Sequence, residues 1–229
     1  MTIEKVLSSL KKNGSAANVK GMERFAITAT KAFGVPAPKI RAFAKAIGTD
    51  HTLSLALWKS GWHEAQILAA FIADHNKITR TAAEKLAAQF ESWAVCDTWC
   101  AEVFCYFPDA DAIAIAWTKD DREFKKRAGF VMMAEMAVHR KELPDELFLR
   151  FFPVIIRHAD DDRNFVRKAV NWALRQIGKK NPALNTAALT IARQLASSSD
   201  ATARWIGSDA VRDLQSDATR RKFERMKRK

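Results

Sequence analysis

The apolar residues of this chain recur almost everywhere with a helical period, at i, i+3 and i+4, and this pattern restricts the fold more than any other feature. The alternation of β-branched and polar residues that is typical of strands is almost absent, and prolines and glycines fall between the helical windows. Several windows open on N-terminal signals such as Pro36, Pro144 and Pro182. The pattern predicts helices over residues 2–12, 16–32, 36–46, 51–60, 63–74, 79–91, 93–106, 109–117, 121–139, 144–157, 163–178, 182–198, 201–214 and 217–227.

Many short helices with tight connections are typical of a helical bundle or a helical solenoid. Helix pairs recur here at about 35 to 40 residues, which is within the range of HEAT and armadillo repeats. We therefore predict an all-α fold, a superhelical solenoid of HEAT- or armadillo-like antiparallel helix pairs with a concave basic face. No break in composition divides the chain, so we expect one repeat domain over residues 1–219, followed by a basic C-terminal tail over residues 220–229.

The chain carries a strong excess of positive charge. It has 38 Lys and Arg residues against 26 Asp and Glu residues, a formal net charge of +12 over 229 residues. Half of this excess lies in the last ten residues, which hold seven basic residues and one glutamate. The other half belongs to the body of the chain, and an anionic partner such as nucleic acid is the usual reason for such an excess. A soluble protein that is merely basic is the alternative.

The features that the sequence lacks also narrow its class. The longest apolar run, near residues 67–73, is much shorter than the roughly 20 residues of a membrane span, and the N-terminus has no apolar signal-peptide core. No P-loop, GxGxxG, HExxH or GxSxG motif is present. Cys96, Cys100 and Cys105 lie on one predicted helix without a CxxC spacing. We expect them to be buried thiols of a protein in a reducing cytoplasm, and not metal ligands.

The most informative segment runs from Ser92 to Cys100, where Asp97 lies inside an otherwise apolar helix. Trp93 and Asp97 are four residues apart and are therefore neighbours on one helical face. A carboxylate on such a helix must be paired, hydrogen-bonded or placed in a cleft, because burying an uncompensated charge is costly. Asp97 is therefore either a structural residue that caps a helix or pairs with an arginine, or a functional carboxylate.

A second segment places Arg127 within an apolar helical stripe, whereas its neighbours Lys125 and Lys126 have the pattern of ordinary solvated charges. A guanidinium that emerges from an apolar stripe can be the structural partner of Asp97, or it can hold a phosphate through two hydrogen bonds. The sequence leaves both roles open, and one arginine can serve both.

A third segment, residues 164–179, combines an apolar stripe with a cationic one. The apolar stripe consists of Val166, Val170, Ala173 and Ile177. Trp172 lies roughly 200° from Val170 around the helix, on the opposite side. It shares that side with Lys168, Arg175 and Lys179. Trp172 either packs against a neighbouring helix or offers an aromatic surface within a phosphate-binding strip.

At these residues the sequence resembles the AlkD-type family of bacterial alkylpurine DNA glycosylases, the DNA alkylation repair enzymes that are built from HEAT-like helical repeats. The matching motifs are Phe33-Gly34-Val35-Pro36-Ala37-Pro38-Lys39-Ile40-Arg41, Ala56-Leu57-Trp58-Lys59-Ser60, His63-Glu64-Ala65, the segment from Ser92-Trp93 to Asp97, Arg127-Ala128, and the segment from Arg167 to Arg175. Together they cover most of the chain between about residues 30 and 180. The first thirty residues and those beyond about 180 match too loosely to transfer a role.

In that family a tryptophan, an aspartate four residues later, an arginine from a following helix and a further tryptophan line the DNA-binding cleft. The resemblance places them at Trp93, Asp97, Arg127 and Trp172, the residues that the physical reading also selects. It implies Asp97 as the catalytic carboxylate, with Trp93 and Arg127 beside it. The DNA-binding residues that we expect are Trp172, Lys168, Arg175, Lys179 and Arg167.

The activity implied by the resemblance is that of a DNA glycosylase of base-excision repair, which hydrolyses the N-glycosidic bond of purines alkylated at N3 or N7 in duplex DNA. Such a base is cationic and is already a good leaving group. An ionised carboxylate helps by stabilising the oxocarbenium-like sugar and by positioning water. The two tryptophans offer aromatic faces, where cation–π attraction contributes about 0.5–2 kcal/mol. The resemblance also implies that the base need not be flipped into a deep pocket.

We expect no cofactor and no metal, and double-stranded DNA containing alkylated bases as the partner. We also expect a monomer with no membrane contact and no obligatory protein partner, located in the bacterial cytoplasm with the nucleoid. The alternative from another class is a non-catalytic HEAT-repeat scaffold that binds nucleic acid or an acidic protein. Such a scaffold needs the basic strip but not Asp97, because a carboxylate in a cationic cleft weakens phosphate binding. The Trp93–Asp97 pair therefore distinguishes the two hypotheses.

Overall fold

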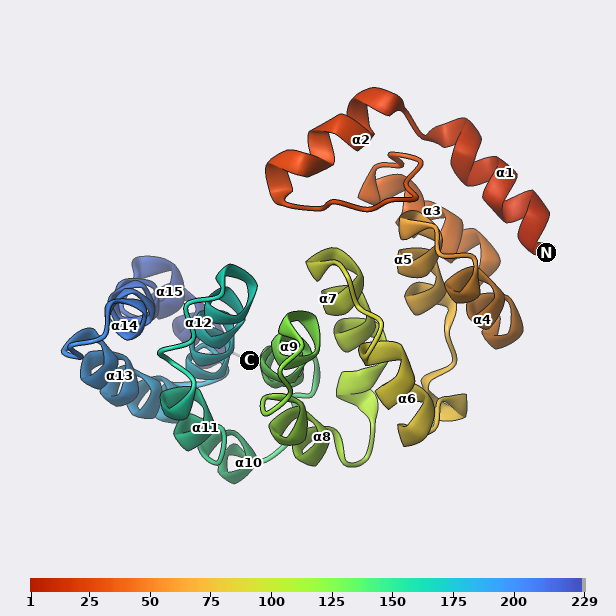
Figure 1. Cartoon of the computed structure of the whole chain (residues 1–229). Helices are drawn as coiled ribbons and strands as arrows, with labels where there is room; N and C mark the ends of the chain where they lie inside the picture. Colours follow the sequence, from red (N-terminus) through yellow and green to blue (C-terminus); the bar gives the residue numbers. More distant parts are fainter. Residues whose placement is uncertain (228–229) are drawn as a thin grey trace. The chain divides into compact units, whose positions relative to one another are not determined.

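The computed structural model describes residues 1–227, and this part of the chain is built from α-helices joined by short connections (Figure 1). It contains fifteen α-helices, three short 3₁₀ helices and no strand within that range. The elements are α1 (Ile3–Asn13), α2 (Ala16–Met22), η1 (Glu23–Phe25), α3 (Ala37–Ile47), α4 (His51–Lys59), α5 (His63–Ile72), η2 (His75–Lys77), α6 (Arg80–Ala87), α7 (Trp93–Glu102), η3 (Phe104–Tyr106), α8 (Ala110–Trp117), α9 (Glu123–His139), α10 (Asp145–Leu149), α11 (Phe152–Arg157), α12 (Asn164–Gly178), α13 (Pro182–Ala196), α14 (Ala201–Leu214) and α15 (Asp217–Lys227). The prediction of an all-α fold is confirmed.

Several of the predicted helices differ from the observed ones. The helix expected over residues 79–91 ends at Ala87, and the helix expected over residues 93–106 ends at Glu102 and is followed by η3. The helix expected over residues 16–32 stops at Met22, and after the turn η1 Ala26 adopts a left-handed φ of 53°, a conformation that ends a right-handed helix. The helix expected over residues 144–157 is divided into α10 and α11. Pro153 explains the division, because it has no backbone N–H and its ring clashes with the carbonyl one turn earlier.

The structure divides into two compact units, unit 1 (Met1–Phe107) and unit 2 (Pro108–Lys229). No change in composition marks the boundary between them. The boundary predicted at residue 219 falls inside α15, and the basic segment is helical as far as residue 227.

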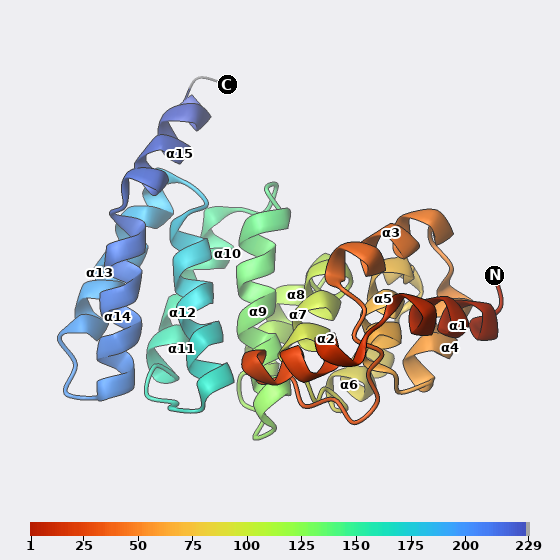
Figure 2. The same cartoon turned by 90° about the horizontal axis from the view of Figure 1, so that it is seen from above.

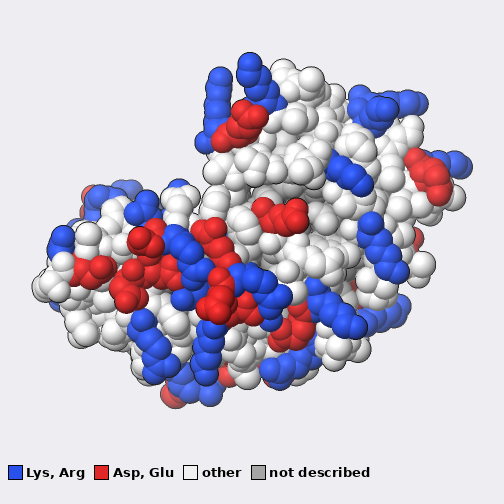
Figure 3. All heavy atoms as spheres, in the orientation of Figure 1, with Lys and Arg blue, Asp and Glu red and all other residues white. Residues whose placement is uncertain are grey.

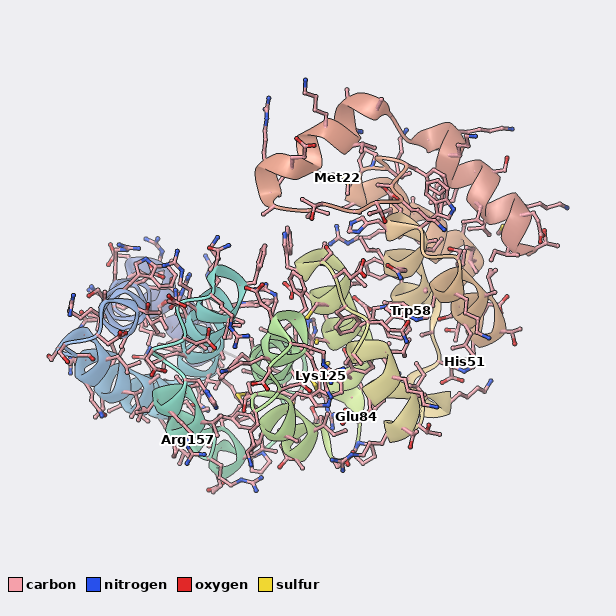
Figure 4. All side chains as sticks on the ribbon, viewed as in Figure 1. Met22, His51, Trp58, Glu84, Lys125 and Arg157 are labelled. Atoms are coloured by element: carbon pink, nitrogen blue, oxygen red, sulfur yellow. The ribbon has the colours of Figure 1, made fainter. Side chains whose placement is uncertain are left out.

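The core of unit 1 is an aromatic cluster that holds α7 in place. The Trp58 and Trp99 rings meet edge to face at 5.3 Å, and Phe104 lies 5.8 Å from Trp99; Figure 4 labels Trp58 on α4. The indole N–H of Trp99 donates to the Gln66 carbonyl at 3.1 Å, which links α7 to α5. Such aromatic pairs contribute about 0.5–1.5 kcal/mol beyond the burial of their surface. The helix that carries Trp93 and Asp97 is therefore rigidly anchored.

The core of unit 2 is organised around α9, which packs against α8 and along α12 (Figure 2). Every residue of α9 from Arg127 to Ala137 is buried. A Cβ atom at Gly129 would lie 2.6 Å from the carbonyl oxygen of Ala114, so only glycine lets the α8 and α9 backbones approach this closely. Helix α12 in turn packs against α13 and α14.

The three cysteines are buried thiols, as predicted. Across residues 1–227, no group of three or more His, Cys, Asp or Glu side chains is arranged to hold a metal ion. None of the helices described is both long enough and apolar enough to cross a membrane.

Candidate functional site

Helix α7 carries Trp93 and Asp97 on the partly exposed side of an otherwise buried helix. Its start is fixed by Ser92, whose Oγ accepts a hydrogen bond from the backbone N–H of Ala94 at 3.2 Å. The buried side consists of Val95, Cys96, Trp99 and Cys100. Trp93 and Asp97 are one turn apart, and each is half-buried. An indole and a carboxylate are thus held side by side on an anchored helix within reach of solvent.

Trp93 also lines a cavity of about 570 Å³ that lies within unit 1. We call it the N-terminal cavity, and its walls come from α2, η1, the start of α3, the start of α5 and the start of α7. Its lining is mostly apolar and includes Asn18, Met22, Phe25, Ile40, His63 and Trp93. The indole Nε1–H of Trp93 donates to the Phe25 carbonyl at 2.9 Å. This hydrogen bond fixes the tryptophan ring against the turn that follows α2.

A buried glutamate organises the loop that forms one wall of the cavity. Glu64 is 1% exposed, and its carboxylate accepts hydrogen bonds from the backbone N–H groups of Phe33 at 2.9 Å, Gly34 at 2.6 Å and Val35 at 3.2 Å. Gly34 has a φ of 74°, and a Cβ atom there would lie 2.3 Å from the Ser15 carbonyl oxygen. Three hydrogen bonds to one charged group are strong, so this loop is fixed to the start of α5.

His63, the residue before Glu64, is 6% exposed and lines the same cavity. Burial lowers the pKa of its imidazole, and the nearby Glu64 carboxylate opposes this effect only partly. Because the net shift is downward, the ring is neutral at pH 7. A neutral imidazole offers one hydrogen-bond donor and one acceptor.

In unit 2, Arg127 joins α9 to the first turn of α12. It is 7% exposed, and its Nη1 donates to the Phe165 carbonyl at 2.7 Å. The Phe124 and Phe165 rings lie 5.1 Å apart beside it. The guanidinium is therefore oriented by a backbone carbonyl as well as by apolar packing, as expected for an arginine within an apolar stripe.

The expectation that Lys125 and Lys126 are solvated charges is wrong. Lys125 is 8% exposed, its Nζ lies 3.1 Å from Asp120 and it faces the Trp117 ring at 5.9 Å; Figure 4 labels it on α9. The Nζ of Lys126 lies 2.7 Å from Asp161. Lys125 pairs with a loop carboxylate that follows α8, and Lys126 pairs with one that follows α11, so the sequence of α9 alone does not show these partners.

Helix α12 has the two sides that its sequence predicted. Val166, Val170, Ala173 and Ile177 are fully buried, whereas Trp172 is half-buried and Lys168 is exposed. The guanidinium of Arg167 lies 5.3 Å above the ring of Trp205, a residue of α14 that is 40% exposed. The Arg167 Nε atom is buried and has no hydrogen-bond partner among residues 1–227.

Arg175 and Lys179, which we expect to bind phosphates, contact two aspartates of α14. Arg175 donates through Nε to Asp213 at 2.6 Å and through Nη1 to Asp209 at 3.2 Å, and the Nζ of Lys179 lies 2.8 Å from Asp213. Burial works to raise the pKa of Asp213, but the hydrogen bonds from Arg175 and Lys179 outweigh it and hold that pKa below its ordinary value. On the face of the molecule shown in Figure 3, acidic and basic side chains lie interleaved over this unit.

The predicted site residues are thus distributed over both units. Trp93 and Asp97 belong to unit 1, whereas the remaining residues, Arg127, Arg167, Lys168, Trp172, Arg175 and Lys179, belong to unit 2.

Sequence reasoning missed the N-terminal cavity, because the segment around Phe25 matched the family too loosely to carry a role. A signal for part of it was present. Glu64 lies in an apolar helix in the same way as Asp97, and the argument that a buried carboxylate needs partners applies equally to it.

Comparisons with known proteins agree with this architecture. The family model described as DNA alkylation repair enzyme matches residues 6–214. No curated protein matches the chain. A solved structure, described as a new family of proteins related to the HEAT-like repeat DNA glycosylases with affinity for branched DNA structures, is similar with a TM-score of 0.75 at 18% sequence identity. The match covers 85% of this chain and 83% of the other, and it supports the HEAT-like fold.

Proposed function

The chain belongs to the DNA alkylation repair enzyme family, and from this premise we propose that it is a DNA glycosylase that hydrolyses the N-glycosidic bond of purines alkylated at N3 or N7. The family supports a role in DNA repair, and the net charge of +12 suits a polyanionic substrate. The particular reaction rests on the residues of α7.

The observation that carries the proposal is the half-buried carboxylate of Asp97, one turn from the half-buried indole of Trp93, on a helix whose other side is closely packed. A protein that only held phosphates would gain nothing from a carboxylate there. In the proposed reaction the bond between the sugar C1′ and the purine nitrogen breaks, and the cationic base leaves as a neutral molecule with the bonding electrons. Asp97 stabilises the positive charge that develops on the sugar. Water then adds to C1′, and Asp97 orients it and accepts its proton.

The residues of unit 2 are proposed to hold the DNA. Arg127, whose guanidinium is oriented by the Phe165 carbonyl, would bind a phosphate, and Lys168 is exposed on α12 near the half-buried Trp172. Phosphate contacts of this kind position a duplex without reading its sequence. We propose that the protein acts as a monomer in the cytoplasm, on double-stranded DNA and without a cofactor.

The second candidate is a protein that binds DNA of unusual structure without excising a base. It is favoured by the similarity to the solved structure whose family has affinity for branched DNA. This candidate also uses a cationic surface, but it has no chemical need for the carboxylate of Asp97.

The release of 7-methylguanine from duplex DNA tests the proposal. Single-turnover assays at saturating enzyme measure the chemical step, and we expect release by the wild-type protein above the spontaneous rate. The exposed Asp162→Asn variant is the matched control for Asp97→Asn and should behave as wild type. If the wild-type protein binds a four-way junction tightly and releases no base, the second candidate is correct.

A further inference from the structure

The N-terminal cavity has the dimensions of a ligand site and lies within a single unit. Its volume of about 570 Å³ falls inside the range of roughly 300–1,000 Å³ that is typical of small-molecule sites, which are mostly apolar with a few polar groups. Helix α2 contributes Ala17 and Gly21, one turn apart, and its last residue Met22 (labelled in Figure 4). Small side chains on this face of α2 leave the space open, and a Cβ atom at Gly21 meets no heavy atom within 4 Å.

Two aromatic residues border the cavity and are coupled to each other. The half-buried indole of Trp93 is held by its hydrogen bond to the Phe25 carbonyl, and the Phe25 ring itself is 66% exposed. The exposed Phe25 ring adds apolar surface at the edge of the cavity. Fixed aromatic faces of this kind favour a flat, aromatic occupant.

A histidine supplies a polar group to the wall of the cavity. His63 is 6% exposed and lines the cavity, and burial lowers the pKa of its imidazole. A neutral imidazole has one hydrogen-bond donor and one acceptor, so it can pair with the polar edge of an uncharged ligand and does not favour an anion.

The charges around the cavity also limit what it can bind. Glu64 contributes to the wall, but its carboxylate is already occupied by the three backbone N–H groups of the adjoining loop. Arg24 is exposed and lines the same cavity. An apolar interior with a neutral polar group and a cation at its edge is complementary to a flat heterocycle that is attached to a phosphate backbone.

We propose that the N-terminal cavity binds one unpaired nucleobase of DNA, with the base against the indole of Trp93, its polar edge on the imidazole of His63 and its backbone phosphate near Arg24. This inference rests on the DNA binding assigned under Proposed function, but it does not require base excision. Through this cavity the protein would prefer DNA in which an unpaired base lies outside the double helix. The first thirty residues would then contribute to DNA binding.

The test compares two duplexes that differ in one group. One carries a single bulged adenine, and the other carries a tetrahydrofuran abasic analogue at the same bulge. Base stacking on an aromatic residue predicts that the wild-type protein binds the bulged adenine at least about fivefold more tightly. Equal affinity for the two duplexes overturns the proposal.

Filling the cavity should abolish this preference. Ala17→Phe and Gly21→Phe place a ring on the face of α2 that lines the cavity, whereas Ala16→Phe places the same ring at an exposed position of the same helix that does not line the cavity. We expect the first two variants to bind both duplexes equally and Ala16→Phe to keep the wild-type preference. His63→Phe, which keeps an aromatic ring but removes the nitrogens, should also lose the preference. If the preference survives in all three cavity variants, the base binds elsewhere.

Two further measurements show whether the base that binds belongs to DNA or to a free nucleoside, and distinguish the cavity proposal from the glycosylase proposal. Free 2-aminopurine riboside should bind much more weakly than the bulged duplex. A different result would indicate that the ligand is a free nucleoside and not DNA. In that case the riboside binds tightly, Gly21→Phe abolishes this binding, and the protein shows no preference between the two duplexes. Release of 7-methylguanine is measured on the same variants. If the wild-type protein shows the preference but no release, the glycosylase proposal fails and the cavity proposal stands, and the reverse result rejects only the cavity.

Discussion

The two units use charge in opposite ways. Unit 2 has 25 basic and 17 acidic residues, whereas unit 1 has 13 basic and 9 acidic residues. Unit 2 therefore has the larger positive excess, yet two cations at the C-terminal end of α12, Arg175 and Lys179, are held by carboxylates of α14. Unit 1 instead places Asp97 and Trp93 in half-exposed positions near an apolar cavity. A count of charges thus overstates the positive surface that unit 2 can offer to DNA.

The pairing in unit 2 follows from helical geometry. Arg175 and Lys179 are four residues apart on α12, and Asp209 and Asp213 are four residues apart on α14, so each pair lies on one face of its helix. The two faces meet in the α12–α14 contact. Charges that are spaced in this way fix the register of the two helices relative to each other. The two cations can bind a phosphate only after they leave the aspartates.

In unit 1, by contrast, one of the two carboxylates on apolar helices accepts hydrogen bonds from the backbone, and the other is partly exposed to solvent. Glu64 satisfies three backbone N–H groups and is closed to other ligands. Asp97 is half-buried and faces the partly exposed side of α7. Two acidic residues in apolar helices of one unit therefore have different environments, and the proposed reaction uses the more exposed one, Asp97.

The largest effect that we expect comes from Asp97→Asn, which removes the charge of this residue and keeps its shape. Preorganised electrostatic groups in active sites are worth about 2.7–4 kcal/mol, so single-turnover release of 7-methylguanine should fall by a factor of roughly 10² to 10³. Affinity for DNA with an uncharged abasic analogue should stay equal or rise, because a negative charge near the phosphates is lost. A parallel fall in melting temperature, affinity and rate would identify Asp97 as a structural residue, and an unchanged rate would reject its catalytic role.

The next largest effect should be on stability, in Glu64→Gln. The amide oxygen of glutamine cannot accept all three backbone hydrogen bonds, and its NH₂ group would face N–H donors, so we expect a loss of about 2–3 kcal/mol in the free energy of unfolding. Urea unfolding monitored by circular dichroism measures this loss. The exposed Glu91→Gln variant is the control and should unfold as wild type. A wild-type unfolding midpoint for Glu64→Gln would show that the loop is held by other contacts.

The fold was largely predictable because helices and their buried sides depend on local periodicity. The core stripe of α12 and the buried cysteines of α7 and η3 follow from the spacing of apolar residues alone. The early end of α2 was not predictable in this way, since the left-handed turn at Ala26 does not come from a glycine or proline at that position. The break at Pro153 had its signal in the sequence.

The candidate site was predictable only where one helix contains all the information. That Trp93 and Asp97 lie one turn apart on the same side of a helix follows from the sequence of α7 alone, and it was predicted. The partners of Lys125 and Arg175 lie on other segments, 5 and 34 to 38 residues away in the chain, and no periodicity within one helix indicates them. Contacts between distant segments, such as that between Trp93 and Phe25, likewise decide where the cavity lies.

A smaller effect concerns acid stability, and it should be specific to the ion pairs of unit 2. Hydrogen bonds from Arg163 and Lys126 outweigh the burial of Asp161 and lower its pKa below the ordinary value. Its contribution is therefore fully present above the unfolded pKa of about 3.9, and it is lost as the pH falls through the lower folded pKa. We expect Asp161→Asn to lower the free energy of unfolding by about 1–3 kcal/mol at pH 7. The difference from wild type should shrink below about pH 4, and a difference that is constant from pH 7 to pH 3 would contradict the assignment.

The smallest effect should distinguish an exposed cation from a paired one on α12. The logarithm of the DNA-binding constant falls linearly with the logarithm of the salt concentration. Removing one phosphate contact reduces the magnitude of this slope by about 0.9. Lys168 is exposed, so Lys168→Ala should show this decrease in duplex binding, whereas Arg175 must leave Asp209 and Asp213 before it can reach a phosphate. We expect a smaller decrease for Arg175→Ala. Asp213→Asn should increase the magnitude of the slope because it removes the charge that pairs with Lys179, whereas Arg175 still contacts Asp209. Titrations between 50 and 200 mM salt, about the range over which such contacts are resolved, give all three slopes. Equal decreases for Lys168→Ala and Arg175→Ala would mean that the contacts between α12 and α14 open when DNA binds, and that the cations of unit 2 are fully available after all.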